Sequence, residues 1–133
     1  MNNNMYKRLI SFFLYWISNS FIFLVADISF PDFFELGNVL LTPSYAALTA
    51  GFILAVVIAL IEPIFNTLNI HVKHQGSWAL VYWIINSEVI WGTARFAEYI
   101  GLGISAYWVA AVVAAAVNIL QWGSWNLVNR TKI

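Results

Sequence analysis

Four long apolar stretches follow one another along the chain, separated by short segments that contain proline, glycine or charged residues. They cover residues 9–28, about 45–65, 77 to about 100, and 104–127. Each is long enough to cross a membrane, since about 20 helical residues span about 30 Å of hydrocarbon. No stretch alternates with a period of two, which excludes a transmembrane β-barrel. The pattern therefore predicts an all-α membrane protein of four transmembrane helices.

The connections between these stretches contain residues that usually end helices. Residues 29–44 include Pro31, Gly37 and Pro43, and we expect a loop there that lies against the membrane surface. The pair Glu62-Pro63 is expected to close the second helix, and residues 101–103 (GLG) to form a tight third connection. Residues 1–133 then make a single transmembrane domain.

One segment of the first stretch recurs in the third. Residues 15–20 (YWISNS) match residues 82–87 (YWIINS) at five of six positions, 67 residues later. The second halves align less closely, 60 residues apart, which makes the first outer connection seven residues longer. We therefore predict two tandem helical hairpins from an internal duplication, at about residues 9–66 and 77–127. Because both would enter the membrane in the same direction, a pseudo-two-fold axis along the membrane normal should relate them.

The few charges decide orientation and partners. Only 9% of the residues are charged, six basic and six acidic, whereas a soluble domain has about a quarter. Most of the surface must therefore face lipid or other helices, and no basic face exists for nucleic acid. Only Arg95 lies toward the outer side, while the other basic residues predict cytoplasmic N- and C-termini in a prokaryotic or phage-related inner membrane: Lys7, Arg8, Lys73, Arg130 and Lys132.

Small residues recur in the second and fourth stretches at helical spacing. Helices in lipid associate through close contact of their backbones, which small side chains permit. We expect these rows to pack helices within the chain, and the alternative is that one row forms a homo-oligomer interface. The candidate packing residues are Ala47, Gly51, Ala55, Ala59, Ala110, Ala111, Ala114 and Ala115.

Polar side chains gather at one expected depth, with Glu88 near the middle of the third stretch. A charged carboxylate there costs about 3 kcal/mol or more, so Glu88 should be protonated or paired. We expect Asn86 to face the first span, and Glu88 to face the fourth span or another protomer. The cluster is either a proton- or ion-responsive site or a structural hydrogen-bond network, and it comprises Asn19, Ser20, Asn86, Ser87, Glu88, Asn118 and Gln121.

Little else in the sequence suggests chemistry. Arg95 has two candidate partners, Glu98 for an ion pair and Trp91 for a cation–π contact. The alternative that we favour is that the Arg95 side chain extends to the outer lipid headgroups. His71 and His74 make a poor metal site, because no third ligand is near. There is no cysteine, no nucleophile–base pair and no phosphate-binding loop. The sequence therefore predicts a protein that is not an enzyme and has no metal or cofactor.

Three features together resemble a known family of small four-span proteins. They are the duplicated hairpin, the small-residue second span that ends in residues 59–63 (ALIEP), and the third span with residues 83–86 (WIIN). Over about residues 10–127 they resemble the phage holin family 4, or holin-like superfamily IV. In that family a basic residue often precedes the proline, where this chain has Glu62. The resemblance implies an oligomer that permeabilises the membrane.

The functional prediction is a small non-enzymatic membrane protein that works as a homo-oligomer, one form of which is a holin-like pore or permeability factor. One alternative is a structural or accessory subunit of a larger membrane complex. A second is a small proton- or ion-coupled transporter that uses Glu88 between the two repeats. In each case the partners are the lipid bilayer and other membrane-embedded chains.

Overall fold

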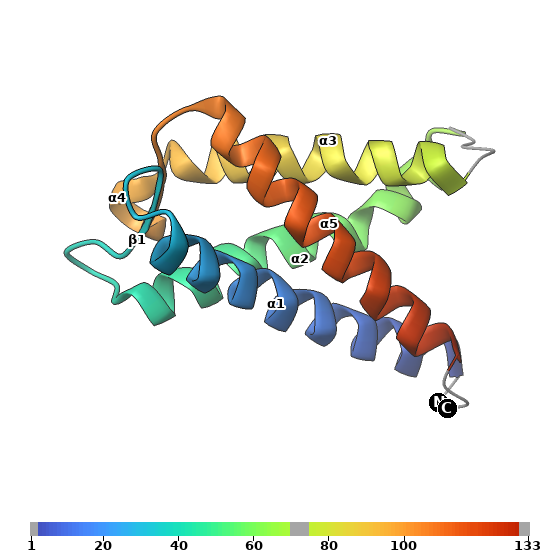
Figure 1. Ribbon diagram of the computed structural model, residues 1–133. Coiled ribbons are helices and arrows are strands. Elements are labelled where there is room, and N and C mark those ends of the chain that lie inside the picture. The colour runs from blue at the N-terminus through green and yellow to red at the C-terminus, as the bar shows by residue number, and fades with distance from the viewer. Residues whose placement is uncertain (1–2, 70–74, 131–133) are drawn as a thin grey trace.

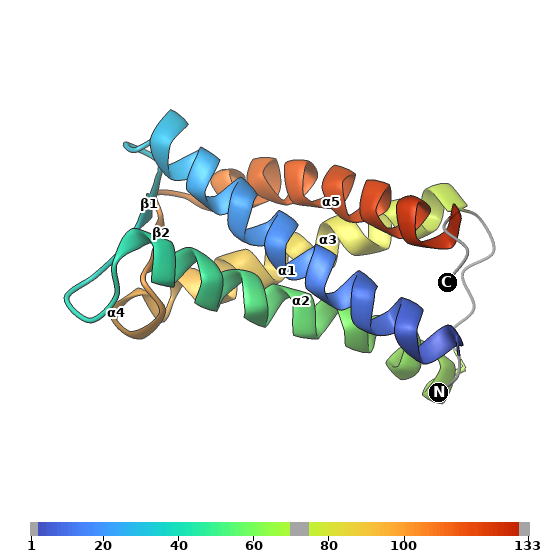
Figure 2. The ribbon, with the colours of Figure 1, turned by 90° about the horizontal axis from the view of Figure 1, so that it is seen from below.

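The computed structural model describes residues 3–69 and 75–130, and these are mostly helical (Figure 1). The helices are α1 (Asn3–Ser29), α2 (Pro43–Thr67), α3 (Gln75–Ala94), the short α4 (Ala97–Ile100) and α5 (Tyr107–Arg130). Two strands, β1 (Phe34–Leu36) and β2 (Leu102–Ile104), lie between them. Both ribbon views place the start of α1 and the end of α5 at one end of the bundle, and the strands and α4 at the other (Figures 1 and 2).

The four long helices bury one face each and expose large apolar side chains on the other. α1 packs against α2 and α5, and α3 packs against α5. Each long helix contributes to the core, with Phe23, Leu54, Ile90 and Val117 almost fully buried. Three helical segments are long and apolar enough to cross a membrane: Tyr6–Ser29, Pro43–Thr67 and Tyr107–Ser124. Exposed apolar faces on such helices are those of a membrane protein, in which lipid covers them.

α3 is not among these three segments, although its 20 residues give it a length of about 30 Å. The polar residues Asn86, Ser87 and Glu88 follow one another in this helix. The sequence places the end of this span near residue 100, but α3 ends at Ala94. The chain then turns, because the backbone amide of Arg95 bonds the carbonyl of Gly92 at 3.2 Å.

The sequence predicts loops where the structure has a short antiparallel ribbon. Glu35 of β1 lies opposite Gly103 of β2, and Phe34 and Leu102 point into the core. Beyond the strands, the amide of Gly37 donates to the carbonyl of Gly101 at 2.7 Å. The prediction was wrong here because three residues are too few to show the alternation that identifies a strand. The ribbon ties the connection between α1 and α2 to the connection between α4 and α5.

α2 also differs from its prediction, since it continues past Pro63 and ends at Thr67. A proline inside a helix removes one backbone hydrogen bond. The last turn persists beyond it, and the hydroxyl of Thr67 donates to the carbonyl of Pro63 at 2.9 Å. Glu62-Pro63 therefore does not close the helix.

The two tryptophans of the recurring segment make matching contacts. The indole nitrogen of Trp16 in α1 donates to the carbonyl of Leu48 in α2 at 2.8 Å. The indole nitrogen of Trp83 in α3 donates to the carbonyl of Ala111 in α5 at 2.9 Å. Leu48 and Ala111 are 63 residues apart, whereas the sequence alignment pairs residues 60 apart. The small residues recur at similar intervals, so several registers look alike in sequence and only the contacts separate them.

Burial follows the same 63-residue register. The buried residues Ala46, Ala47, Ala50 and Leu54 of α2 correspond in this register to Val109, Ala110, Val113 and Val117 of α5, which are also buried. The tryptophans and serines of the recurring segment are 67 residues apart, so the two connections differ by four residues rather than seven.

Gly51 allows α1 and α2 to approach closely. A Cβ atom at this position would lie 3.0 Å from the amide nitrogen of Ser20 and 3.2 Å from the carbonyl oxygen of Trp16. These are backbone atoms of α1, so they cannot move aside without shifting the helix. At Gly92, by contrast, a Cβ atom would meet nothing within 4 Å.

This contrast gives a matched pair of variants. We expect Gly51→Ala to lower the free energy of unfolding by about 1–3 kcal/mol, because it overpacks the α1–α2 contact. Gly92→Ala should leave stability unchanged or raise it by up to about 1 kcal/mol through helix propensity. Unfolding of both variants in mixed micelles, followed by circular dichroism, measures the difference. Equal effects of the two substitutions would contradict this account of the helix contact.

Candidate functional site

Asn19, Asn86 and Gln121 form a polar centre between α1, α3 and α5. Asn19 and Asn86 are fully buried and Gln121 nearly so. The Nε2 atom of Gln121 donates to the Oδ1 atoms of Asn19 at 3.1 Å and Asn86 at 3.3 Å. Asn86 returns a bond from Nδ2 to Oε1 of Gln121 at 3.0 Å, and Asn19 donates to the carbonyl of Gly51 at 3.2 Å. Every amide group of the polar centre thus has a partner.

The other four members of the expected polar cluster lie outside this network. Ser20 and Ser87 each donate to the carbonyl of the tryptophan four residues earlier, at 2.8 Å. Asn118 donates to the carbonyl of Ala79 at 3.1 Å. The serines follow their asparagines directly and are turned by about 100° around the helix, so they bond their own helix instead. Asn86, expected to face the first span, bonds α5, and only Gln121 links it to α1.

Glu88 is exposed on the outer face of α3 and bonds α5. The hydroxyl of Tyr107 donates to its Oε1 atom at 2.6 Å. Glu88 precedes Ala94, the end of α3, by six residues, which is about 9 Å along the axis. The sequence placed the end of this helix near residue 100, so Glu88 lies closer to the end of α3 than expected, while its depth in a membrane stays a prediction. We expected Glu88 to face either the fourth span or another protomer. In the structure it contacts the fourth span, which is α5.

Two further side chains continue from Glu88 toward the end of α3. The ring of Trp91 lies 6.0 Å from that of Tyr107, edge to face at 61°. The guanidinium carbon of Arg95 lies 4.4 Å from the centre of the Trp91 ring, a cation–π distance. Of the two expected partners Arg95 thus uses Trp91, and no Arg95–Glu98 ion pair forms in the part of the chain that the structure describes. We call Glu88, Trp91, Arg95 and Tyr107 the outer strip.

The small residues divide into two groups. Inside the bundle lie Ala47, Gly51, Ala55, Ala110 and Ala114. Ala111 is half-buried, and Ala59 and Ala115 are exposed. Most of the predicted rows therefore pack helices within the chain, and two positions remain on the surface.

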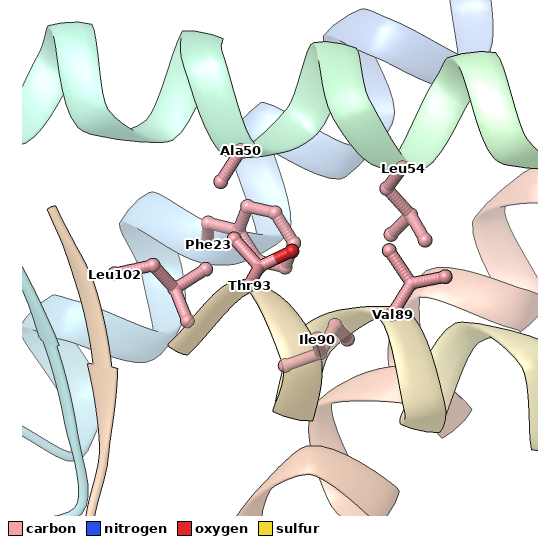
Figure 3. Close-up of a pocket in the computed structure, with 7 residues that line it drawn as sticks. All are labelled: Phe23, Ala50, Leu54, Val89, Ile90, Thr93 and Leu102. Carbon is pink, nitrogen blue, oxygen red and sulfur yellow. The ribbon is translucent and has the colours of Figure 1, made fainter. Parts of the chain in front are cut away.

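The interior gap between α1, α2 and α3 is too small to hold a water molecule. Figure 3 shows the side chains that line it, with the Thr93 hydroxyl as their single polar group: Phe23, Ala50, Leu54, Val89, Ile90, Thr93 and Leu102. Among the described residues no group of three or more potential metal ligands occurs, and His71 and His74 lie outside those residues.

Sequence reasoning missed the roles of four further residues. It assigned no partner to Tyr107, and it did not assign the indole bonds of Trp16 and Trp83. In both copies of the recurring segment a tryptophan stands three residues before an asparagine, and this repetition was a usable signal for those bonds. For Asn38 there was none: this loop residue accepts bonds from two backbone amides and donates to the carbonyls of Ala97 and Glu98.

The polar centre predicts a large effect of one substitution. Gln121→Leu should lower the free energy of unfolding by about 2 kcal/mol or more, because it leaves buried amide groups of Asn19 and Asn86 without partners. The triple variant with leucine at all three positions is the control, since it leaves no buried polar group unpaired. It should recover much of the lost stability in detergent unfolding experiments. A triple variant less stable than Gln121→Leu would show that the amides do not act as one network.

Comparisons with known proteins leave the function to be argued from this geometry. No protein family, no curated protein and no solved structure matches the chain. Two features of the molecule bear on function: a polar centre with all its partners inside, and an outer strip that exposes a carboxyl group on a helix surface.

Proposed function

We propose that all four long helices cross the membrane. α2 ends, and α3 begins, at the end of the bundle opposite to the start of α5 (Figure 2). If α2 and α5 both cross, α3 has to return through the bilayer between them. Its length of about 30 Å fits the hydrocarbon layer, and Asn86 and Ser87 turn their polar groups inward.

An origin of the bundle by duplication is supported by its paired contacts. The Trp16–Leu48 and Trp83–Ala111 bonds have the same form in the two hairpins. In the ribbon, Glu35 and Gly103 lie opposite each other at its middle. An axis through this pair and along the bundle would exchange the hairpins, and it is the membrane normal if the helices span the bilayer.

The basic residues give the orientation, with both termini in the cytoplasm and the β1–β2 ribbon outside. Since the chain has no cysteine, single cysteines test this directly. We expect Asn3→Cys and Val39→Cys, at a fully exposed position, to react with a membrane-impermeant maleimide from opposite sides. Intact cells or sealed vesicles, compared with permeabilised ones, provide the measurement. Labelling of both from the same side would overturn the four-span topology.

For function, we infer a non-enzymatic homo-oligomer that changes membrane permeability, with the outer strip at the contact between protomers. The observation that carries this is Glu88, an ionisable group exposed on a membrane-facing helix. Such a group costs about 3 kcal/mol or more against lipid, and a neighbouring protomer or water between protomers removes part of that cost. Gly92, one turn from Glu88 on the same face, leaves open space for a close helix contact.

Because the interior of the bundle is filled, a path for solutes between protomers is better supported than a path through a single protomer. The amides of the polar centre bond one another, and the gap beside Thr93 holds no water. A four-helix bundle of this kind has a packed core and no channel. Solutes would therefore cross where several protomers meet, and the resemblance to the holin family supports the same conclusion.

One observation favours an accessory subunit as the second candidate. In the described part of the chain, Arg95 is the one cation at the outer end of the bundle, and it already lies over Trp91. A second copy thus offers Glu88 no free cation, whereas a different membrane helix could. The transporter alternative needs Glu88 between the two hairpins, so its exposed position outside them argues against it.

A matched pair of cysteine variants tests the oligomer. Gly92 and Val25 occupy corresponding positions, 67 residues apart, but only Gly92 lies beside the outer strip. We expect Gly92→Cys to form a disulfide-linked dimer under mild oxidation in liposomes, and Val25→Cys to remain monomeric. The liposomes should also release an entrapped dye, and Glu88→Gln should change the release rate at least several-fold.

The outcome of purification separates the two candidates. A single component with several protomers supports the permeability factor. A monomer of this chain bound to larger subunits, without dimers of Gly92→Cys, would instead support the accessory role.

A further inference from the structure

We propose that Val39 and Leu40, at the tip of the connection between β1 and α2, form a docking site for a basic partner protein outside the membrane. We call these two residues the outer tip. The proposal rests on the orientation proposed above, which places the β1–β2 ribbon outside, and it goes beyond the permeability function. The partner that fits has an apolar pocket on a surface rich in lysine or arginine.

The outer tip carries apolar side chains at the far end of the bundle. Val39 is fully exposed, and Leu40 is 70% exposed. In both ribbon views the connection from β1 to α2 reaches further from the centre of the bundle than the neighbouring α4 does (Figures 1 and 2). These side chains therefore add nothing to the core and are accessible to another protein.

Asn38 holds the outer tip in one conformation. Its Nδ2 atom donates to the carbonyls of Ala97 at 2.9 Å and Glu98 at 2.8 Å, both in α4. Its Oδ1 atom accepts from the backbone amides of Leu40 at 2.8 Å and Leu41 at 2.6 Å. The backbone amide of Asn38 also donates to the carbonyl of Leu41 at 2.9 Å. A loop that is ordered in this way before binding loses less conformational entropy when a partner binds it.

The second hairpin shows that the bundle does not need the outer tip to join a strand to a helix. The ribbon ends with the same kind of backbone bond on both sides, donated by Gly37 at 2.7 Å and by Ser105 at 2.9 Å. Between Gly37 and α2 the chain places residues 38–42, whereas between Ser105 and α5 it places Ala106 alone. The longer loop, with its apolar tip and the asparagine that fixes it, therefore has a role other than connection.

The charges at this end of the bundle indicate the chemistry of the partner. Asp32, Glu35 and Glu98 are exposed there, and the backbone of Glu98 is bonded to Asn38 beside the tip. Arg95 is the one cation at this end in the part of the chain that the structure describes, and its guanidinium group already lies over an aromatic ring. An acidic end with an apolar tip is complementary to a basic surface with an apolar pocket.

The same charges argue against two other occupants. A second copy in the same orientation presents the same acidic end, so like charges would face each other across the contact. Anionic lipid headgroups would be repelled in the same way, because they attract basic segments and not acidic ones. A basic protein segment meets neither penalty, and it is the occupant that the outer tip fits.

Photo-crosslinking from the outer tip in cells of the natural host tests the proposal. p-Benzoylphenylalanine is placed at position 39 of the full chain, and the matched control carries it at position 105. Ser105 is exposed and lies on the corresponding connection of the second hairpin. We expect the probe at position 39 to give an adduct with a different protein, which the probe at position 105 does not give. Mass spectrometry of the adduct should place the bond in a segment that contains lysine or arginine.

Substitutions in the chain with the probe at position 39 test the two causes separately. Glu35→Gln combined with Glu98→Gln should lower the adduct yield several-fold, because it removes the charge complementarity. Asn38→Ala should lower it as well, because the apolar side chains remain but lose their fixed conformation. Thr67→Ala removes a hydrogen bond at the opposite end of the bundle and should leave the yield unchanged. Circular dichroism of the purified variants measures whether each is folded.

Adducts formed only with lipid or with a second copy of this chain would overturn the proposal. So would the absence of any adduct, a partner on the cytoplasmic side, or a yield that the two glutamine substitutions leave unchanged. Dimer formation by Gly92→Cys, measured in the same cells, reports on the homo-oligomer separately. A basic partner at position 39 without such dimers would support the outer tip and remove the homo-oligomer.

Discussion

The three-way contact of Asn19, Asn86 and Gln121 is the constraint on which the rest of the bundle depends. In hydrocarbon a buried amide finds no water, so each must reach a partner in the protein. This requirement holds α1, α3 and α5 at one depth and in one register. The close approach at Gly51 completes it, because the carbonyl of Gly51 accepts the remaining bond of Asn19. Without that approach the Nδ2 group of Asn19 would have no acceptor for its hydrogen bond.

A centre that satisfies itself leaves no polar group free for a ligand, and this moves the chemistry to the surface. Each bond donated by Gln121 is accepted by an asparagine, and the adjacent gap is apolar except for Thr93. The outer strip has the opposite character, since one oxygen of Glu88 has no hydrogen-bond partner among the described residues. Activity inside the bundle would have to break the network that builds it, whereas activity at the strip would not.

Sequence patterns predicted the features that depend on a period and missed those that depend on a single contact. Long apolar periods gave the helices, and the recurring segment was visible in the sequence, although the tryptophan bonds that it makes were not predicted. The end of α3 at Ala94 was not predicted, because a backbone turn sets it and composition does not. The β1–β2 ribbon and the bonds of Asn38 were out of reach, because both join residues distant in the chain through backbone groups that every residue has.

Hydrogen bonding explains one difference between the two hairpins and does not explain another. Gln121 corresponds to Ile58 in the 63-residue register. Near the proposed two-fold axis one glutamine supplies both asparagine oxygens, so a second glutamine at position 58 would be buried without a partner. That difference follows from counting donors and acceptors. Glu88 in place of a residue such as Phe21 follows from no such count, since it satisfies no buried group and, with α3 across the membrane as proposed, it costs free energy against lipid. An asymmetry that the fold does not need, and that lipid opposes, is the strongest reason to assign the function of this chain to the outer strip.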